Sequence, residues 1–256
     1  MDIRTETKGS VTKLWFSDVK PGWEQLILLR SDAHHDNPSC NRVLEKKHLD
    51  EALAKNAIVL DGGDLFDGMQ GRHDPRRSYR DLKPEYKVDT YFDAIEEDAL
   101  KFYSPYAGII KLLARGNHEM SIIKNSQTDL TSRLSADLNR LGGKTVVGGY
   151  GGWLILYFSY KGANRSSMKV RYFHGAGGEA PVTRGAIDTA RQAVYLPDCQ
   201  IVWNGHSHNV YAIPIQRKRI NSHGKLYDEV AYHIRTPGYK DDWGDGSEGF
   251  EVERSG

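Results

Sequence analysis

The chain has 256 residues and a formal net charge of +1. Its length suits a single domain over residues 1–256 with a substantial core, and its near-neutral charge produces no overall field that would favour nucleic acid or a membrane. The chain has only two cysteines, which argues against a disulfide framework. No run approaches the roughly 18 apolar residues that a membrane helix needs, so we expect a cytoplasmic protein.

Strand and helix patterns alternate through the first half of the chain. Val11–Val19 predicts a strand, and the turn at Pro21-Gly22 leads into a second strand over Gln25–Arg30. The next expected elements are a helix over Asn41–Lys55, a strand over Ala57–Leu60, a helix over Val88–Phe102 and a strand over Ile109–Leu113.

The same alternation continues to the end of the chain. We expect a helix over Leu130–Leu141, a strand over Val170–Phe173, a helix over Arg184–Tyr195 and a strand over Ile201–Trp203. The last 20 residues predict irregular surface chain. Strands that alternate with helices indicate the α/β class, and no linker divides the chain.

Five of the apolar runs end in residues that commonly bind metals. In chain order these are Asp32-Ala33-His34, Gly63-Asp64, Gly116-Asn117-His118-Glu119, His174 and Gly205-His206-Ser207-His208. Ligands of open α/β sheets bind outside the carboxyl ends of the strands, so we expect the five clusters to converge on one site. They contain enough ligands for two metal ions.

Each cluster has a distinct coordination chemistry. Asp32 and His34 alternate beyond a strand, so both side chains can reach the same crevice. Asp64 follows two glycines that permit a sharp turn, and its two oxygens can bridge two cations. Asn117 adds a neutral oxygen ligand. Mixed oxygen and imidazole ligation favours Mn²⁺, with Fe or Zn as alternatives, over calcium.

In this order, the five clusters resemble the complete motif set of the calcineurin-like metallophosphoesterases. The motifs extend over about 175 residues, from Asp32 to His208. The neighbouring segments 31–37, 84–86 and 181–185 are further similar to phage and prophage metallophosphoesterases, which would place the protein in a host cytoplasm.

The resemblance implies a four-layer α/β/β/α sandwich with a dinuclear metal site at the carboxyl ends of its strands. It implies that one metal is held by Asp32, His34, Asp64 and His208, and the other by Asp64, Asn117, His174 and His206. His118 would not be a ligand: it would face the leaving group, oriented by Glu119 or a neighbouring acid.

The implied activity is metal-dependent phosphoester hydrolysis, with in-line attack by a metal-bound hydroxide and His118 as general acid. A phosphodiesterase, including a nuclease that acts on DNA, is the favoured form. The alternatives are a phosphomonoesterase, a small-molecule or nucleotide phosphodiesterase, and a non-catalytic scaffold on the same fold.

Substrate contacts are less sharply indicated. The loop Gly71–Lys87 has a surplus of three positive charges with two interleaved tyrosines, which suits either a phosphate-contacting surface or a solvated loop with internal ion pairs. The candidate substrate contacts are His35, Arg72, Arg76 and Arg77. Arg217-Lys218-Arg219 is a second basic run, which we expect to be a solvated face.

Overall fold

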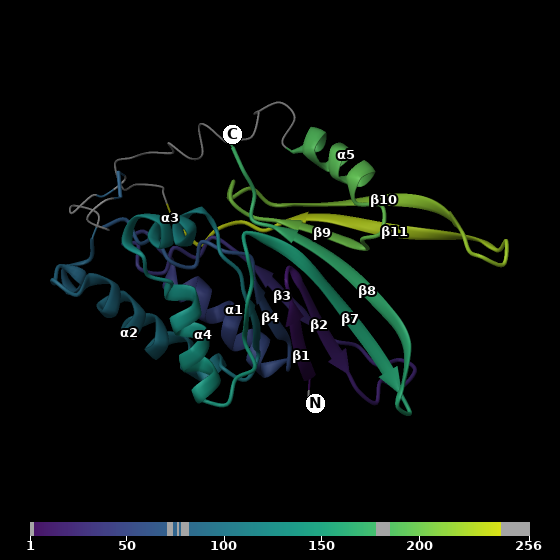
Figure 1. The fold of residues 1–256 in the computed structure, drawn as a ribbon, viewed down its shortest axis with the longest axis horizontal. Helices are drawn as coiled ribbons and strands as arrows, with labels where there is room; N and C mark the ends of the chain where they lie inside the picture. Colours follow the sequence, from purple (N-terminus) through teal and green to yellow (C-terminus); the bar gives the residue numbers. More distant parts are fainter. Residues whose placement is uncertain (1–2, 71–73, 76, 78–81, 178–184, 242–256) are drawn as a thin grey trace.

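The strands of the protein form two sheets (Figure 1). The structure, a computed structural model, describes residues 3–70, 74, 75, 77, 82–177 and 185–241. Within these ranges the large sheet has seven strands, in the spatial order β1 (Ile3–Lys8), β2 (Val11–Phe16), β7 (Gly151–Tyr160), β8 (Ala163–Phe173), β9 (Ile201–Asn204), β11 (Leu226–Arg235) and β10 (Tyr211–Ile220). The small sheet is parallel, in the order β3 (Ile27–Arg30), β4 (Ile58–Asp61), β5 (Ile110–Leu113) and β6 (Val146–Val147).

Helices cover the small sheet on one face. They are α1 (Arg42–Ala54), α2 (Tyr91–Tyr103), α3 (Asn117–Ser126) and α4 (Leu130–Arg140), with short 3₁₀ turns at Pro84–Tyr86 and Ser104–Tyr106. Side-chain caps fix two of the helix starts: Asn41 accepts from the Leu44 amide and Asp129 from the Ser132 amide. The buried faces of the helices pack on Val59 and Leu113 of the small sheet.

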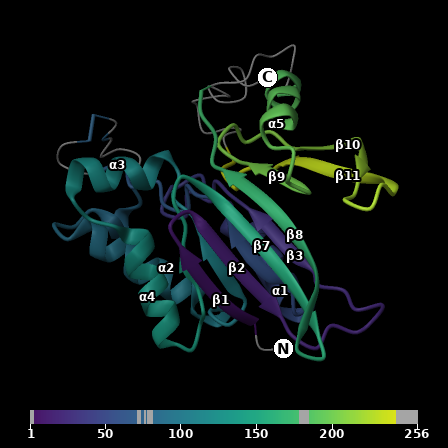
Figure 2. The ribbon, with the colours of Figure 1, turned by 45° about the vertical axis from the view of Figure 1, so that its right-hand side comes forward.

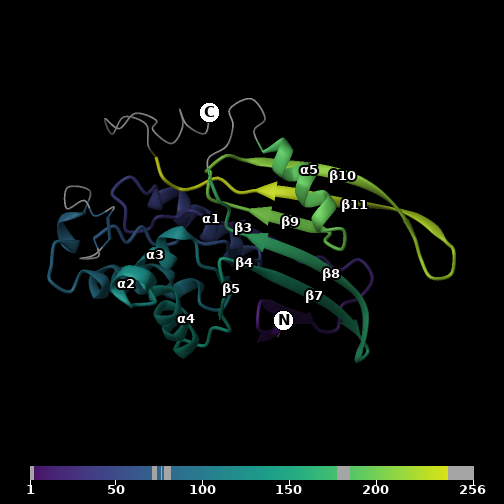
Figure 3. The same cartoon turned by 45° about the horizontal axis from the view of Figure 1, so that its top comes forward.

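The other face of the small sheet packs against the large sheet. Ile58 and Leu60, which alternate with Val59, contact a core that includes Leu14, Leu154 and Tyr172 of the large sheet. The last helix, α5 (Ala186–Tyr195), lies against β9 and β10 on the outside of the large sheet (Figure 3), where Thr189 and Tyr211 are 3.4 Å apart through their hydroxyls. The molecule therefore belongs to the mixed α/β class.

The sequence located most of these elements, with ends shifted by a few residues. The expected strands at 11–19 and 25–30 are confirmed as β2 and β3, but they belong to different sheets, so the Pro21-Gly22 turn leads from one layer to another. Strands β1, β6, β7 and β11 and helix α3 were not predicted. Most of the expected irregular C-terminal segment lies outside the described residues.

None of the helices in the described part of the chain has the length and apolar character needed to cross a membrane.

A buried ionic network joins the small sheet to its helices. Arg30, whose side chain is 2% exposed, donates from Nε to Asp61 Oδ2 at 2.7 Å and from Nη2 to the Tyr103 hydroxyl at 3.0 Å. Its Nη1 lies 2.9 Å from Glu45 Oε1. Burial opposes ionisation of Glu45, but the Arg30 charge and the His35 hydrogen bond outweigh it and lower the Glu45 pKa to about 2.

Removal of the cation at the centre of this network should destabilise the fold. Replacing Arg30 with Met leaves two buried carboxylates without their partner, so we expect Arg30→Met to lower the free energy of unfolding by about 3–5 kcal/mol. Urea denaturation measures the change. Lys46→Met, which breaks an exposed pair with Asp50, is the control and should have far less effect. Equal effects of the two substitutions would contradict a structural role for the network.

Candidate metal centre

The five motif clusters meet at one place, and they come from two sheets. Asp32, Asp64 and Asn117 follow β3, β4 and β5 of the small sheet, while His174 and His206 follow β8 and β9 of the large sheet. Within each sheet the contributing strands run parallel, so their carboxyl ends point the same way. The expected convergence is present, although the pattern of apolar runs alone did not assign the contributing strands to two sheets.

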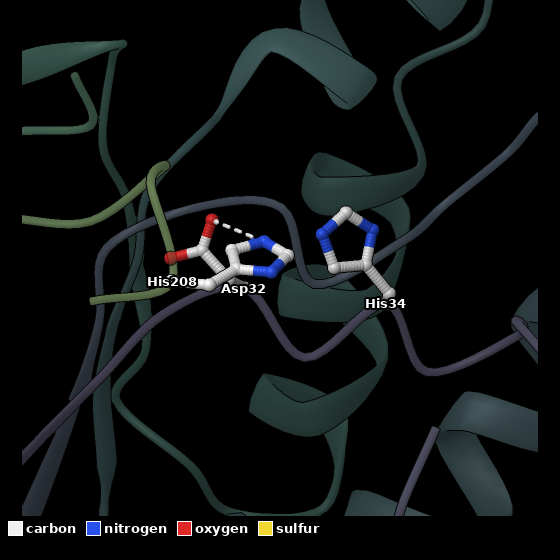
Figure 4. A group of neighbouring side chains, drawn as sticks. All are labelled: Asp32, His34 and His208. Carbon is white, nitrogen blue, oxygen red and sulfur yellow. Dashed lines mark ion pairs between the residues drawn. The ribbon is translucent and has the colours of Figure 1, made fainter. Parts of the chain in front are cut away.

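The predicted ligands form two adjoining groups. In the first, ligand atoms of Asp32, His34 and His208 lie within 4.8 Å of one another (Figure 4), and His208 Nε2 is 3.6 Å from Asp32 Oδ1. In the second, Asp64, His174 and His206 lie equally close.

Asp64 lies between the two groups. Its Oδ2 is 3.0 Å from His174 Nε2, and it also forms a close group with His34 and His118. Asn117 Oδ1 lies 3.1 Å from the same His174 nitrogen, so the amide belongs to the second group. One carboxylate is thus within reach of both groups, as a bridging ligand would be.

Several of these residues have unfavourable backbone conformations. Positive φ angles of 46° to 76° occur at Asp32, His34, Asp64, His206 and His208. For non-glycine residues such conformations cost on the order of 1–3 kcal/mol each and concentrate at functional sites. Hydrogen bonds between the loops hold them: the Asp32 amide donates to Gly63 O at 2.8 Å, and the His34 amide to Asp64 O at 2.9 Å.

Two glycines allow the loops to approach this closely. Gly63 has a φ of +108°, and a Cβ there would lie 2.5 Å from the Gly116 nitrogen. A Cβ at Gly116 would clash with the Asp64 carboxylate. Gly63 before Asp64 and Gly116 before Asn117 are therefore required by the contact between the β4 and β5 loops.

The histidine protonation pattern fits a bound cation. His174 Nδ1 lies 3.0 Å from the Gly62 carbonyl oxygen, which can only accept, so Nδ1 carries the proton. In the neutral ring, Nε2 then has a lone pair that points at the negatively charged Asp64 carboxylate, and the two repel each other. A positive charge at Nε2, from a proton or a metal ion, removes this repulsion. Burial opposes protonation, but Asp64 and Asp32 outweigh it and raise the His174 pKa to about 10.

His34 shows the same arrangement. Its Nδ1 is 3.0 Å from Asp67 Oδ1, whereas its buried Nε2 has no hydrogen-bond partner. A histidine that ligates through one nitrogen usually donates from the other to a carboxylate or carbonyl, and both His34 and His174 have that second contact. The residues present therefore fit two divalent cations, with Nε2 of each ring directed at them.

His118 lies beside the cluster. It is half-exposed, its Nδ1 is 2.7 Å from the Asp67 carbonyl oxygen and 3.2 Å from Asp67 Oδ1, and its Nε2 is 4.0 Å from Asp64 Oδ2. The His118 amide, near the start of α3, donates to Asp64 Oδ1 at 2.9 Å. The same peptide segment thus places the imidazole and holds the shared carboxylate.

Glu119 has a different position from the one expected. Its two carboxylate oxygens accept the amides of Asp64 (3.0 Å), Phe66 (2.9 Å) and Gly116 (2.7 Å), so it shapes the loops and does not orient His118. Burial and the Asp64 charge raise the pKa of Glu119 to about 8. The acid that contacts His118 is Asp67, three residues after Asp64.

Among the expected substrate contacts, the structure places His35 away from the cluster. His35 is buried, with Nδ1 3.0 Å from Glu45 Oε2 and its ring 4.5 Å from that of Phe102, so it belongs to the Arg30 network. Arg72 and Arg76 lie outside the described residues, and Arg77 is exposed. Tyr86 is buried and donates to Asp98, so it is not a surface ring for stacking.

Two contacts near the cluster had no signal in the sequence. Tyr150, before β7, donates its hydroxyl to Gly175 O, and its ring centroid is 5.4 Å from that of His174. Arg235 Nη1 donates to Ser207 Oγ at 2.8 Å, between the two histidines of the last motif. Both residues lie far in sequence from the motifs that they contact.

Adjacent histidines give a direct test of this geometry. We expect His34→Gln to weaken Mn²⁺ binding strongly, because it removes a nitrogen aimed into the cluster. His35→Gln should leave the number of bound Mn²⁺ ions unchanged and lower the unfolding free energy, because it disrupts the Arg30 network. Isothermal titration calorimetry and urea denaturation separate the two effects. The reverse assignment, with metal loss in His35→Gln alone, would refute the geometry.

A scan against models of known protein families finds no model that matches this chain, and a search of curated proteins finds no significant match. What the residues do is therefore inferred from the geometry of the cluster and from the order of its motifs in the chain.

Proposed function

We propose that this chain is a phosphoester hydrolase of the calcineurin-like metallophosphoesterase type, dependent on two divalent metal ions. The observation that carries the proposal is the meeting of all seven expected ligands in two adjoining groups, with Asp64 within reach of both and His118 beside them. Chance placement of strand-end residues from two sheets does not account for so complete a set.

The arrangement of layers supports the same assignment. Helices α1–α4, the small sheet, the large sheet and α5 follow one another in the order of an α/β/β/α sandwich (Figures 1 and 3). The cluster lies at the carboxyl ends of strands from both inner layers, where that fold places its metals.

The ligand roles follow from the two groups. Asp32, His34 and His208 would hold one cation, and Asn117, His174 and His206 the other, with Asp64 shared. Mn²⁺ is the expected metal, with Fe or Zn as alternatives, because the donors are carboxylate, amide and imidazole groups. When bound, such a pair would neutralise phosphate charge and lower the pKa of a water nucleophile.

The residues of the chain provide orientation and a proton. Asp67 fixes the His118 ring through Nδ1, which leaves Nε2 directed toward the cluster. In the doubly protonated ring, Nε2 carries the proton that a departing oxygen needs. A general acid of this kind typically contributes a factor of about 10²–10⁴. The complete ligand set and the position of His118 argue against a non-catalytic scaffold.

We favour a phosphodiester as the substrate, with DNA as one form, over a phosphomonoester. His206, His208, Asn117 and His118 are half-buried, whereas Asp32, Asp64, His34 and His174 are buried. The cluster therefore reaches the surface on the side of His206, His208 and His118, where a phosphate with substituents on both sides can enter.

The first experiment compares substrates. We expect Mn²⁺-dependent hydrolysis of bis-p-nitrophenyl phosphate to exceed that of p-nitrophenyl phosphate, and end-labelled DNA to be degraded. Asp64→Asn should lose metal binding and activity together. Asp198→Asn, at an exposed acid before β9 and therefore at the end of that strand away from the motif, is the matched control and should keep both. A preference for the monoester with DNA intact would identify a phosphatase, and inactivity with every metal would contradict the proposal.

His118 can be separated from the ligands. We expect His118→Asn to bind both metal ions and to lower kcat by about 10²–10⁴ for a diester with a poor leaving group, with a smaller loss for p-nitrophenolate, which departs without protonation. Metal stoichiometry by calorimetry and kcat for the two substrates provide the test. Loss of one metal ion in this variant would make His118 a ligand.

A further inference from the structure

Strands β1, β2, β7 and β8 have an outer face that carries aromatic and basic side chains. Leu14, Leu154 and Val170 point into the core between the sheets, so the residues that alternate with them point outward. In Figure 2 these strands lie in front, with the small sheet and α1 behind them. The outward residues form what we call the outer platform: Arg4, Lys13, Trp15, Trp153, Tyr157 and Arg171.

The strand register places the platform residues side by side. Arg4 pairs with Trp15, Trp15 with Tyr157, and Trp153 with Arg171. The Trp15 and Tyr157 rings stack at 5.6 Å between centroids with 16° between their planes. The Arg4 guanidinium lies 4.7 Å from the Trp15 ring, and that of Arg171 lies 5.7 Å from the Trp153 ring. The three rings are half-buried, so each also faces solvent.

The charge of the platform is positive. Arg4, Lys13 and Arg171 contribute three cations, and Glu6, which lies 3.2 Å from Arg4 and opposite Lys13 in the strand register, contributes one anion. The Arg4 side chain is 73% exposed, so it is free to turn from its ring toward a phosphate. Rings for stacking beside exposed or half-buried cations on a sheet face are the features that single-stranded nucleic acid recognises.

The platform leads to the metal cluster along β8. The Arg171 guanidinium is 5.9 Å from the Phe173 ring, Phe173 is 5.5 Å from Tyr150, and Tyr150 is 5.4 Å from His174. These steps connect the outer face to a residue of the second ligand group. A strand bound on the platform would thus lie beside the end of β8 that carries His174.

We propose that the outer platform binds single-stranded nucleic acid, with bases against Trp15, Tyr157 and Trp153 and phosphates at Arg4, Lys13 and Arg171. Bases in a duplex are stacked on one another and cannot lie against these rings, so the platform selects the unpaired form. The role of the bound strand as the substrate rests on the proposed phosphodiesterase function, whereas binding by the platform does not.

Binding is measured without cleavage. The probe is a fluorescein-labelled oligothymidylate of about 20 nucleotides, longer than the roughly 4–16 nucleotides covered by one binding fold. Its anisotropy is followed with the Asp64→Asn protein in EDTA. We expect Trp15→Leu to weaken binding roughly 5- to 150-fold, the range for loss of one stacked base, and Trp15→Phe to keep most of the affinity. Tyr227→Leu, on the exposed β10–β11 hairpin, is the aromatic control and should bind like the parent.

The ionic part of the proposal is tested in the same assay. The slope of log K against log salt concentration measures the number of phosphate contacts, and each contact on a single strand contributes about 0.7 to it. The double substitution Arg4→Gln/Lys13→Gln removes two cations and should therefore make this slope shallower by up to about 1.4. The control is the double substitution Lys218→Gln/Lys225→Gln, which removes two positive charges from the β10–β11 hairpin. It breaks one exposed ion pair, between Lys218 and Asp228, just as the platform variant breaks the pair between Arg4 and Glu6. This control should leave the salt dependence unchanged.

The outcomes separate the two proposals. Three results would contradict binding by the platform. They are no binding of the oligonucleotide by the parent protein, equal affinities of the platform variants and their controls, and tighter binding of a duplex than of the single strand. A purely structural role for Trp15 would lower the melting temperature of Trp15→Leu and leave affinity unchanged. Platform-dependent binding in a protein that hydrolyses no phosphoester would leave the platform standing and remove the hydrolase proposal.

Discussion

Two carboxylates, Asp32 and Asp64, lie almost fully buried at the junction of the two sheets, and the surrounding loops are arranged around their charge. A buried anion is costly unless it is hydrogen-bonded and paired. Backbone amides supply part of the compensation, from His206 to Asp32 and from His118 to Asp64. His34 and His174 supply the rest: Asp67, followed by Asp64 and Asp32, raises the pKa of His34, and Asp64 and Asp32 raise the pKa of His174. The left-handed ligand residues and the glycines beside them follow from the need to bring these donors within reach of two carboxylates.

A second charged network lies behind the first. His34 contributes to the cluster, while the next residue, His35, turns into the network of Arg30, Glu45 and Asp61. Asp61 also accepts from the Gly63 amide, so the strand end that carries Asp64 is held from the helix side as well. Consecutive residues therefore serve two different purposes, one at the open cluster and one in the interior. The helix layer supports the loops that form the site by means of ionic contacts in addition to apolar packing.

The sequence predicted the α/β class, most strand positions and the residues that meet at the cluster, because short apolar runs that end in Asp, Asn or His are distinctive patterns. It did not predict β1, whose charged and polar residues alternate with little apolar content, or β7, whose aromatic residues point to both faces of the sheet. The strand patterns did not show which strand belongs to which of the two sheets, because strand pairing depends on contacts between distant segments. Glu119 and His35 were misplaced for a related reason: both are adjacent to ligands in sequence, but the direction of a side chain depends on the local backbone. Asp67 shows that a residue can also support the cluster without belonging to a motif. It contacts His34 and His118, which are both distant from it in the chain.

The origin of the ligands in two sheets has a consequence for assembly. The first half of the chain supplies Asp32 to Asn117 on the small sheet, and the second half supplies His174 to His208 on the large sheet. A cation bound as proposed by both sets would be a noncovalent cross-link between the two sheets. Its binding free energy would add to that of docking the sheets, so the stability of the molecule would rise with the logarithm of free metal concentration above the dissociation constant. The supply of metal would then set how firmly the two halves of the chain are held together.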